Sequence, residues 1–307
     1  MKILLFGITQ FAVKALKKLI LLKQIPDGVV LNQFYSQDIE TINLICKDHN
    51  IPVYSYEKIN NPQFIDLVKH VIKPDLLLVF TFDQKLSPEI YESARYAINM
   101  HPSYLPYYRG NNPYFWCIAN GEEYTGVTLH FITENFDSGE IIYQEKVPIH
   151  PDDTCGMVIA KQEIVAIDLL EKLLTHIQSG EELPRQPQLQ GNFPKAPKLQ
   201  VQDCFIHWDW TSQKIVNHIR ALNPYTGSYT QYKNTVLAIY DGSATNYESN
   251  DEPGTIVSFS AEGPLIKSGN GGVILKILTC GKKYLLSGND FIEYEKVQIG
   301  EKFATWE

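Results

Sequence analysis

The sequence predicts an α/β protein: a Rossmann-like, mostly parallel sheet covered by helices, followed by a smaller β-rich domain. The first part rests on apolar runs of strand length that alternate with helical periodicity through the first hundred residues. Such alternation is typical of a parallel sheet with helices on both faces. The second part rests on a Pro- and Gln-rich segment at 181–202 and on the short strand-like runs beyond it, separated by Gly, Asn and Asp.

Apolar runs ended by Gly or polar residues predict buried parallel strands, because helices cover both faces of such a sheet. They are KILLFG (2–7), DGVVLNQF (27–34), IPVYSY (51–56), PDLLLVFTF (74–82) and RYAINMH (95–101). Helical patterns join these runs at 9–23, 38–50, 61–73 and 87–94. Leu16 and Leu19 fall on one face of the first helix, and Pro62 suits the first turn of the third.

After this alternation the pattern predicts another helix, two strands and a long helix. The ranges are 112–121, 126–132, 140–149 and 154–180. Thr154 would cap the long helix, and Gly180 would end it.

The remaining sequence predicts a second domain that resembles a partly open, OB-like barrel. It begins with a helical pattern at 209–222 and continues in short strands. We therefore expect a catalytic domain at 1–180, a linker at 181–202 and a β-rich domain at 203–307.

Composition argues against a protein whose main task is to grip nucleic acid. The 307 residues are 44% hydrophobic, which is enough for two cores. The net charge is −8, whereas neutralising phosphates needs a basic face. No apolar run approaches the roughly 18 residues that span a bilayer, so no membrane partner is expected. The N-terminal MKILLFGITQF is interpreted as a strand and the start of a helix, not as a signal peptide.

The cysteines lie at 46, 117, 155, 204 and 280, an odd number without a CxxC pair. This pattern argues against a disulfide scaffold and against a structural zinc site. We therefore expect a reducing compartment, the cytoplasm.

The stretch NMHPSYLPYYRG (99–110) carries the first candidate for chemistry. Asn99 and His101 lie at the end of a predicted strand, where open parallel sheets bind ligands. Asp137 lies in the turn TENFDSG between two later strands. An amide, an imidazole and a carboxylate in one cleft suit acyl transfer, because they can stabilise an oxyanion and move protons.

The residues alone also allow a structural interpretation. A lone histidine at a strand end is more often a satisfied structural residue, and an aspartate in FDSG is more often a plain turn former. Spacing does not decide between the two interpretations.

The segment NMHPSYLPYYRGNNPYFWCIANGEEYTGVTLHFITENFDSGEII (99–142) resembles the signature of the formyltransferases that use N10-formyltetrahydrofolate. The matching features are Asn-x-His, the S-x-L-P-x-x-R-G loop, the GVTLH strand and the D-S-G-E-I turn. FIHWDWTSQKIVNHIRALNPYTGSY (205–229) is similar to the start of the C-terminal domain of the longer members, methionyl-tRNA formyltransferase among them. The sequence looks most like the enzymes that formylate amino sugars on nucleotides.

The resemblance implies roles for the candidate residues. Asn99, His101 and Asp137 fall on the family's catalytic triad: the first two hold the formyl oxygen as it becomes an oxyanion, and Asp137 helps move the amine's proton, through water. N10-formyltetrahydrofolate is the expected co-substrate, and no metal is expected. The residues implied in folate binding are Phe82, Lys85, Leu86, Glu134 and Asp137, and those implied on the acceptor side are Ser103, Tyr108, Arg109 and Asn112.

Simpler alternatives remain for several of these residues. Phe82 and Leu86 are as readily core residues, and Arg109 could lock its loop onto the sheet. FGITQF lacks the G-x-G-x-x-G pattern, so a dinucleotide cofactor is not indicated. The remaining histidines considered lack metal-ligand spacing and are interpreted as structural or exposed: His130, His150, His207 and His218.

The expected acceptor is a small nucleotide-linked amino sugar of the kind used for surface polysaccharides. Methionyl-tRNA formyltransferases carry a basic insertion after the second strand, whereas LNQFYSQDIETINL (31–44) has no Lys or Arg. No nucleic-acid partner is therefore expected, and the second domain would serve in packing, homodimer formation or an accessory role. The alternatives are a methionyl-tRNA formyltransferase, a formyl-folate hydrolase or formyl-folate-binding module, and a non-catalytic sugar-nucleotide binder.

Overall fold

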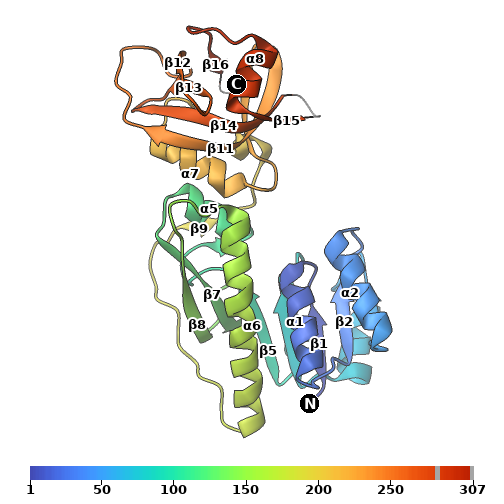
Figure 1. Ribbon diagram of the computed structural model, residues 1–307. Helices are drawn as coiled ribbons and strands as arrows, with labels where there is room; N and C mark the ends of the chain where they lie inside the picture. Colours follow the sequence, from blue (N-terminus) through green and yellow to red (C-terminus); the bar gives the residue numbers. More distant parts are fainter. Residues whose placement is uncertain (281–283, 305–307) are drawn as a thin grey trace. The chain divides into compact units, whose positions relative to one another are not determined.

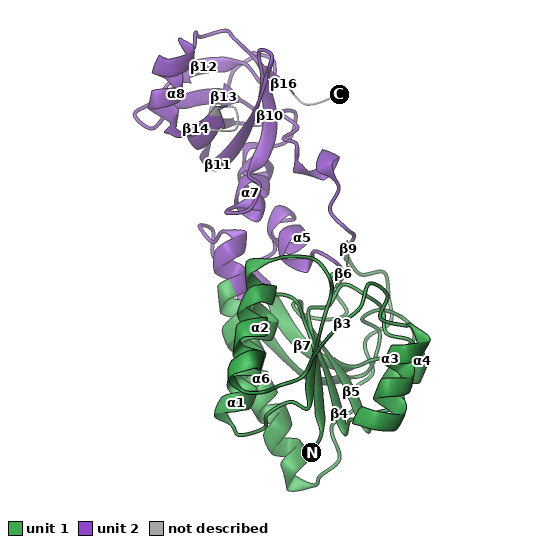
Figure 2. Ribbon diagram, turned by 90° about the vertical axis from the view of Figure 1, so that its right-hand side faces the viewer, with its two compact units in different colours: residues 1–110, 125–147, 160–195 green, residues 111–124, 148–159, 196–307 purple. Residues whose placement is uncertain are grey.

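The computed structural model describes residues 1–280 and 284–304 (Figure 1). Two compact units divide the chain (Figure 2). The first unit comprises residues 1–110, 125–147 and 160–195, and the second comprises 111–124, 148–159 and 196–307.

This division differs from the predicted domains 1–180 and 203–307 with a linker at 181–202. The chain enters the second unit twice before its C-terminal part, and residues 181–195 of the predicted linker belong to the first unit. Composition identified a segment without regular periodicity, but it could not show that this segment packs onto a unit. Residues 281–283 and 305–307 of the predicted second domain lie outside the described residues.

A seven-stranded sheet forms the first unit. Its strands are β1 (Ile3–Phe6), β2 (Gly28–Leu31), β3 (Val53–Ser55), β4 (Leu76–Phe80), β5 (Tyr96–His101), β7 (Tyr124–Phe131) and β8 (Ile141–Pro148). Their order is β3-β2-β1-β4-β5-β7-β8. The strands from β3 to β5 pair in parallel, and β7 pairs antiparallel with β5. The predicted mostly parallel α/β fold is confirmed.

Helices lie on both sides of this sheet. They are α1 (Gln10–Leu21), α2 (Gln37–Asp48), α3 (Pro62–Asp66), α4 (Pro88–Tyr91) and α6 (Cys155–Ser179). In Figure 2, α1, α2 and α6 lie on one side and α3 and α4 on the other. Because both faces are covered, β1, β2 and β4 are buried along their whole length, which explains their uninterrupted apolar sequences.

The predicted helix at 61–73 is shorter and less regular than expected. Asn61 caps α3 by accepting a hydrogen bond from the Phe64 N–H, and Pro62 occupies its first turn as predicted. The backbone then changes to a π-helical segment at Leu67–Ile72. Lys73 ends it with φ 49°, and the residue before a proline is disfavoured in the α conformation.

The second unit contains an antiparallel half-barrel, which confirms the predicted β-rich domain. Its strands are β10 (Ser228–Tyr232), β11 (Thr235–Thr245), β12 (Ile256–Phe259), β13 (Pro264–Lys267), β14 (Gly272–Cys280), β15 (Tyr284–Ser287) and β16 (Phe303–Ala304). The helices of this unit are α5 (Pro113–Ala119), α7 (Ser212–Leu222) and α8 (Gly288–Glu295), with a 3₁₀ turn at Val201–Cys204. Two short strands, β6 (Arg109–Gly110) and β9 (Lys195–Ala196), form a separate ladder.

Aromatic rings fill the centre of the half-barrel. The Tyr232 ring lies 5.0 Å from that of Phe303 and 5.3 Å from that of Phe291. Ile215 and Ile219, one turn apart on α7, are buried in the same cluster. Across the described parts of both units, no helix combines the length and the hydropathy that a membrane crossing requires.

Candidate active site

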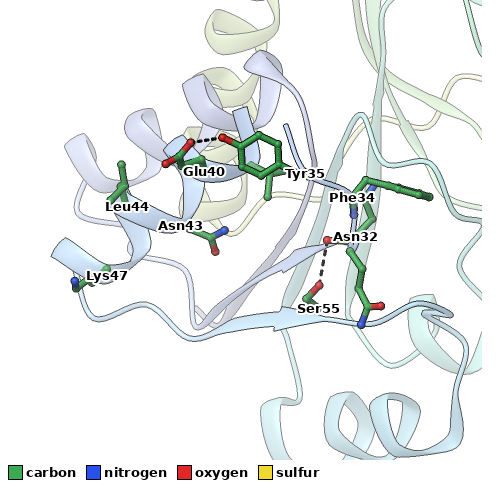
Figure 3. Close-up of a pocket in the computed structure, with 10 residues that line it drawn as sticks. Asn32, Phe34, Tyr35, Glu40, Asn43, Leu44, Lys47 and Ser55 are labelled. Carbon is green, nitrogen blue, oxygen red and sulfur yellow. Dashed lines mark hydrogen bonds between the residues drawn. The ribbon is translucent and has the colours of Figure 1, made fainter. Parts of the chain in front are cut away.

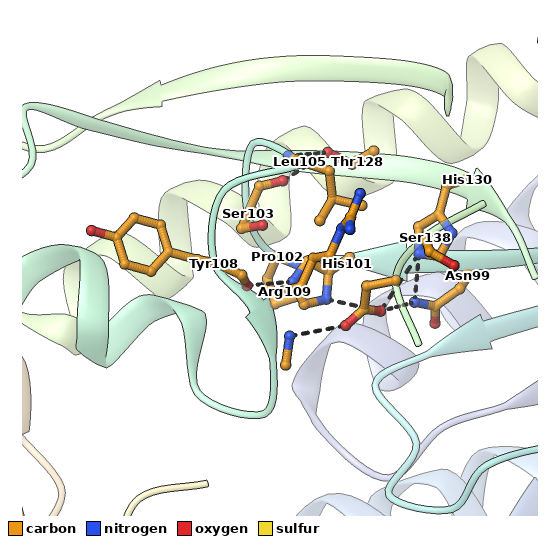
Figure 4. Close-up of polar contacts among 12 residues, drawn as sticks. Asn99, His101, Pro102, Ser103, Leu105, Tyr108, Arg109, Thr128, His130 and Ser138 are labelled. Atoms are coloured by element: carbon orange, nitrogen blue, oxygen red, sulfur yellow. Dashed lines mark hydrogen bonds and ion pairs between the residues drawn. The ribbon is translucent and has the colours of Figure 1, made fainter. Parts of the chain in front are cut away.

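The predicted strand end and the predicted turn meet in the first unit, where Asp137 lies beside Asn99 and His101. Figure 4 labels Asn99 and His101 among the polar contacts of this region. Asn99 and His101 project from the carboxyl end of β5. Asp137 lies in the turn between β7 and β8 and has φ 51°. Its Oδ1 lies 3.4 Å from Asn99 Nδ2 and 3.4 Å from His101 Nδ1. The structure thus brings together an amide, an imidazole and a carboxylate.

The backbone of the loop after β5 orients His101. Its Nε2 lies 2.9 Å from the Tyr108 carbonyl oxygen. A carbonyl can only accept, so Nε2 carries a hydrogen and Nδ1 is the ring atom that faces Asp137. His101 is only 5% exposed. Burial lowers its pKa below the usual value, and the nearby Asp137 charge opposes that effect.

Asp137 is held as a carboxylate. Burial alone would raise its pKa, but His101, His130 and the Gly110 N–H lower it to about 2. The charge effect of His101 needs an imidazolium, which burial disfavours. The Gly110 N–H, 3.0 Å from Oδ2, does not depend on any protonation state. The Gly110 N–H therefore favours the ionised form of Asp137, whereas burial and the Asp137 charge act in opposite directions on the pKa of His101.

His130, which the sequence predicts to be structural or exposed, is buried beside the candidate catalytic residues. It is 2% exposed and lies directly opposite Asn99 in the β5–β7 register. Its Nδ1 donates to the Phe131 carbonyl 2.9 Å away, so in the neutral ring Nε2 is the acceptor. Nε2 accepts from Asn99 Nδ2 at 3.0 Å and lies 3.6 Å from Asp137 Oδ1. His130 therefore fixes which way the Asn99 amide points.

For His218, by contrast, the structural interpretation agrees with the structure. Its Nε2 donates to the Asp203 carbonyl oxygen, and its Nδ1 lies 2.8 Å from the Ser228 hydroxyl. Burial lowers the pKa of His218 to about 4. With both ring nitrogens bonded, this histidine is a satisfied core residue of the second unit.

The residues predicted to bind folate divide into core and surface positions. Leu86 is buried in the cluster that contains Phe6, and the Phe82 ring packs edge-on against Phe6 at 5.5 Å. The core alternative therefore describes Leu86 and Phe82 well. Lys85 lies with its ammonium 5.8 Å from the Phe136 ring, and Glu134 is exposed. A folate-binding role for any of these positions remains a prediction.

Most of the predicted acceptor-side residues have backbone partners. Ser103 is fully buried, and its hydroxyl donates to the Tyr107 carbonyl, so it shapes the loop and is not open to an acceptor. Tyr108 is buried with φ 59°, and its carbonyl holds His101. Asn112, in the second unit, accepts from the Leu199 N–H at 3.0 Å. Apart from Arg109, these positions build the loops.

Gln188 joins Arg109 to the Asp137 turn, and sequence reasoning missed it. The Gln188 Oε1 accepts from Arg109 Nε at 3.1 Å and from Nη2 at 2.5 Å. Its Nε2 donates to the carbonyls of Asp137 and Gly139. Arg109 is thus locked to its surroundings, as the alternative interpretation expected, but through a neutral amide. A glutamine in a Pro- and Gln-rich segment carries no signal that marks it out.

A hollow lies beyond the carboxyl end of β2 (Figure 3). Its lining residues are Asn32, Gln33, Phe34, Tyr35, Ile39, Glu40, Asn43, Leu44, Lys47 and Ser55. The Tyr35 hydroxyl donates to Glu40 at 2.8 Å, while Phe34 points away from Tyr35. Half of the lining residues are therefore aromatic or carry a side-chain amide, and Lys47 is the basic one.

No group of three or more His, Cys, Asp or Glu side chains suited to a metal ion occurs within residues 1–280 and 284–304. The expectation that catalysis needs no metal remains a prediction.

Two family matches identify the class of protein that this fold and site define. Residues 25–170 match the family described as "Formyl transferase", and residues 198–295 match "Formyl transferase, C-terminal domain". The chain belongs to the formyl transferase family and is a formyltransferase.

Individual relatives extend this likeness over nearly the whole chain. A methionyl-tRNA formyltransferase of Desulforamulus reducens is 30% identical over 308 residues, covering 98% of this chain and 96% of that protein. One from Carboxydothermus hydrogenoformans is 31% identical over 312 residues and covers 99% of each.

Solved structures share the fold at lower identity. WlaRD, a sugar 3N-formyl transferase, has a TM-score of 0.70 at 22% identity and covers 92% of this chain and 99% of its own. The N-formyltransferase of Helicobacter canadensis has a TM-score of 0.68 at 23% identity, covering 92% of this chain and 100% of its own. At these identities the likeness shows the fold alone.

Proposed function

We propose that this protein transfers the formyl group of N10-formyltetrahydrofolate to a primary amine and that Asn99, His101 and Asp137 carry the reaction. The observation that supports it most is the meeting of these side chains at the carboxyl end of β5, with both Asn99 Nδ2 and His101 Nδ1 3.4 Å from Asp137 Oδ1. The folate donor follows from the resemblance at 99–142 and from membership of the family.

The reaction forms a bond between the amine nitrogen and the formyl carbon and breaks the bond from that carbon to N10. One proton leaves the attacking nitrogen and one arrives at N10, so the enzyme ends in its starting state. As the formyl oxygen gains charge, the Asn99 amide can donate to it, and His101 Nδ1 can do so once it has taken the proton from the attacking amine, before it passes that proton to N10. A carboxylate whose pKa is about 2 is a poor base at neutral pH. His101 is therefore the better proton carrier, and Asp137 stabilises its imidazolium.

Methionyl-tRNA is the acceptor that the relatives favour. Methionyl-tRNA formyltransferases about 30% identical to this chain cover nearly its full length, the C-terminal domain included. The α-amino group of the methionyl ester is a primary amine, as the proposed chemistry requires. We propose it as the first acceptor to test.

A specific observation favours a nucleotide-linked amino sugar as the second acceptor. The segment 31–44 contributes most of the residues that line the hollow in Figure 3, and it has no Lys or Arg. Binding along an RNA strand needs several cationic contacts to phosphates, whereas exposed rings such as Phe34 and Tyr35 can stack on a single base. The net charge of −8 supports the same choice.

The two acceptors can be compared in one assay. The protein is mixed with N10-formyltetrahydrofolate and either initiator methionyl-tRNA or a panel of nucleotide amino sugars, at low and at physiological salt. Released tetrahydrofolate and the mass of the formylated product are both measured. Acceptor-dependent release supports the transferase. Release without an acceptor supports the hydrolase instead, and absence of turnover with every amine contradicts the proposal.

A further inference from the structure

We propose that Gln188 is a positioning residue that sets the catalytic turn and the acceptor-side arginine with one side chain. This inference rests on the proposed function, because it assigns a role within that reaction. Gln188 lies in the segment first interpreted as a linker, and it is only 6% exposed. Its amide bonds two segments that are far apart in the sequence, Arg109 and the turn at 137–139.

The nitrogen end of the amide holds the turn. Gln188 Nε2 donates to the Asp137 carbonyl at 2.9 Å and to the Gly139 carbonyl at 2.8 Å. Asp137 needs such support, because φ 51° is an unfavourable conformation for a residue with a Cβ. Gly139 allows the turn to lie close to the end of β7, because a Cβ at this position would lie 1.8 Å from the Phe131 carbonyl oxygen. The two N–H donors therefore fix the backbone that carries the catalytic carboxylate.

The oxygen end of the same amide holds Arg109. Gln188 Oε1 accepts from both Nε and Nη2 of the guanidinium, which fixes its plane. An amide oxygen orients the arginine and leaves its charge in place, whereas a carboxylate would cancel that charge. The charge therefore remains available for an anionic group of the acceptor, a phosphate or a carboxylate.

Only a side chain with two donors and an acceptor can perform both tasks. A glutamate would keep the acceptor for Arg109 but would face the two carbonyls with oxygen, and a methionine of similar size would lose both sets of bonds. The loop and the turn are also joined directly, because the Gly110 N–H donates to Asp137 Oδ2 at 3.0 Å. Gln188 and this bond together set the catalytic carboxylate and the acceptor-side loop against each other.

The test compares Gln188→Glu with Gln188→Met in the formyl-transfer assay. Loss of the two donors should lower kcat of Gln188→Glu by about a hundredfold, as expected for a misplaced catalytic group. Its acceptor KM should rise by about tenfold, because the new carboxylate pairs with Arg109 and cancels the charge that would bind the acceptor. Gln188→Met should show the same loss of kcat and also a KM for the acceptor raised by about tenfold, because Arg109 is no longer oriented. The pH profile of kcat should shift in both variants.

Gln186→Glu is the matched control. It makes the same substitution two residues away at an exposed position, where the hydrogen bonds to Ile141 come from the backbone. Thermal melting identifies any variant that has lost its fold, and wild-type transfer in the same assay tests the proposed function separately. Wild-type kcat, KM and pH profile in Gln188→Glu would overturn the inference. An acceptor KM that stays at its wild-type value in both variants would overturn it as well.

Discussion

Two strand ends on the carboxyl edge of the same sheet are built in opposite ways. At the end of β5, His101 is 5% exposed, and the side chains of its neighbours Asp137 and His130 are 10% and 3% exposed. At the end of β2, Phe34 and Tyr35 are 73% and 84% exposed. The polar side chains of the first region are hydrogen-bonded to one another and to the backbone, whereas the second presents exposed rings. The contrast suits the end of β5 to the proposed reaction and the end of β2 to the proposed recognition of an acceptor.

Removing the His101 imidazole at the end of β5 should abolish most of the formyl-transfer activity. His101→Ala takes away the proton carrier and an oxyanion donor together, so formyl transfer should fall by at least about a hundredfold. Initial rates at saturating folate and acceptor give the measurement. His150→Ala, at an exposed histidine, is the control and should keep wild-type rates. Near-normal activity in His101→Ala would remove the catalytic assignment.

The charge of Asp137, at the same strand end, should make the free energy of unfolding depend on pH. The pKa of Asp137 is lowered from 3.8 to about 2, so its carboxylate contributes about 2 kcal/mol above pH 4, and this contribution is lost as the pH falls through about 2. Asp137→Asn has no such charge. The difference between the free energies of unfolding of the two proteins in urea should therefore shrink on acidification. A difference that stays constant with pH would contradict the assigned shift.

The orientation of Asn99 offers a smaller test of the same region. His130→Phe removes the acceptor at Nε2, which leaves the Asn99 amide free to turn, and kcat should fall by about tenfold. His130→Gln supplies another acceptor and should retain more activity. If both variants keep the wild-type kcat, His130 does not position Asn99.

The same residues show which contacts of the candidate site the sequence can predict. The sequence predicts that Asn99, His101 and Asp137 lie close together, because each follows or joins predicted strands and parallel strands end at a common edge. Their catalytic roles are implied only by the resemblance at 99–142. His130 was missed because its meeting with Asn99 depends on the β5–β7 register, which an alternating pattern does not state. Gln188 was missed for a different reason. It lies in a segment without periodicity, and its partners Asp137 and Arg109 are 51 and 79 residues away in the sequence.

The fold class could be predicted for the same reason that most of the site could. Buried strands and amphipathic helices are local patterns, and they recovered the sheet of the first unit and the half-barrel of the second. The division into units could not be read in this way, because residues 111–124 and 148–159 join the second unit through contacts distant in sequence.

Removing an exposed aromatic ring beyond β2 should have the smallest effect of these substitutions, and it should change acceptor binding alone. If Phe34 stacks on a base of the acceptor, Phe34→Ala should raise the KM for a nucleotide amino sugar by about fivefold, the low end expected for one stacked base. The kcat should not change, since Phe34 contacts none of the catalytic triad. Because the ring is exposed, stability should stay within about 0.5 kcal/mol of wild type. Phe259→Ala, at an exposed ring of the second unit, serves as the control. An unchanged KM in Phe34→Ala would remove the hollow from acceptor recognition and leave the charge of segment 31–44 as the remaining argument for a small acceptor.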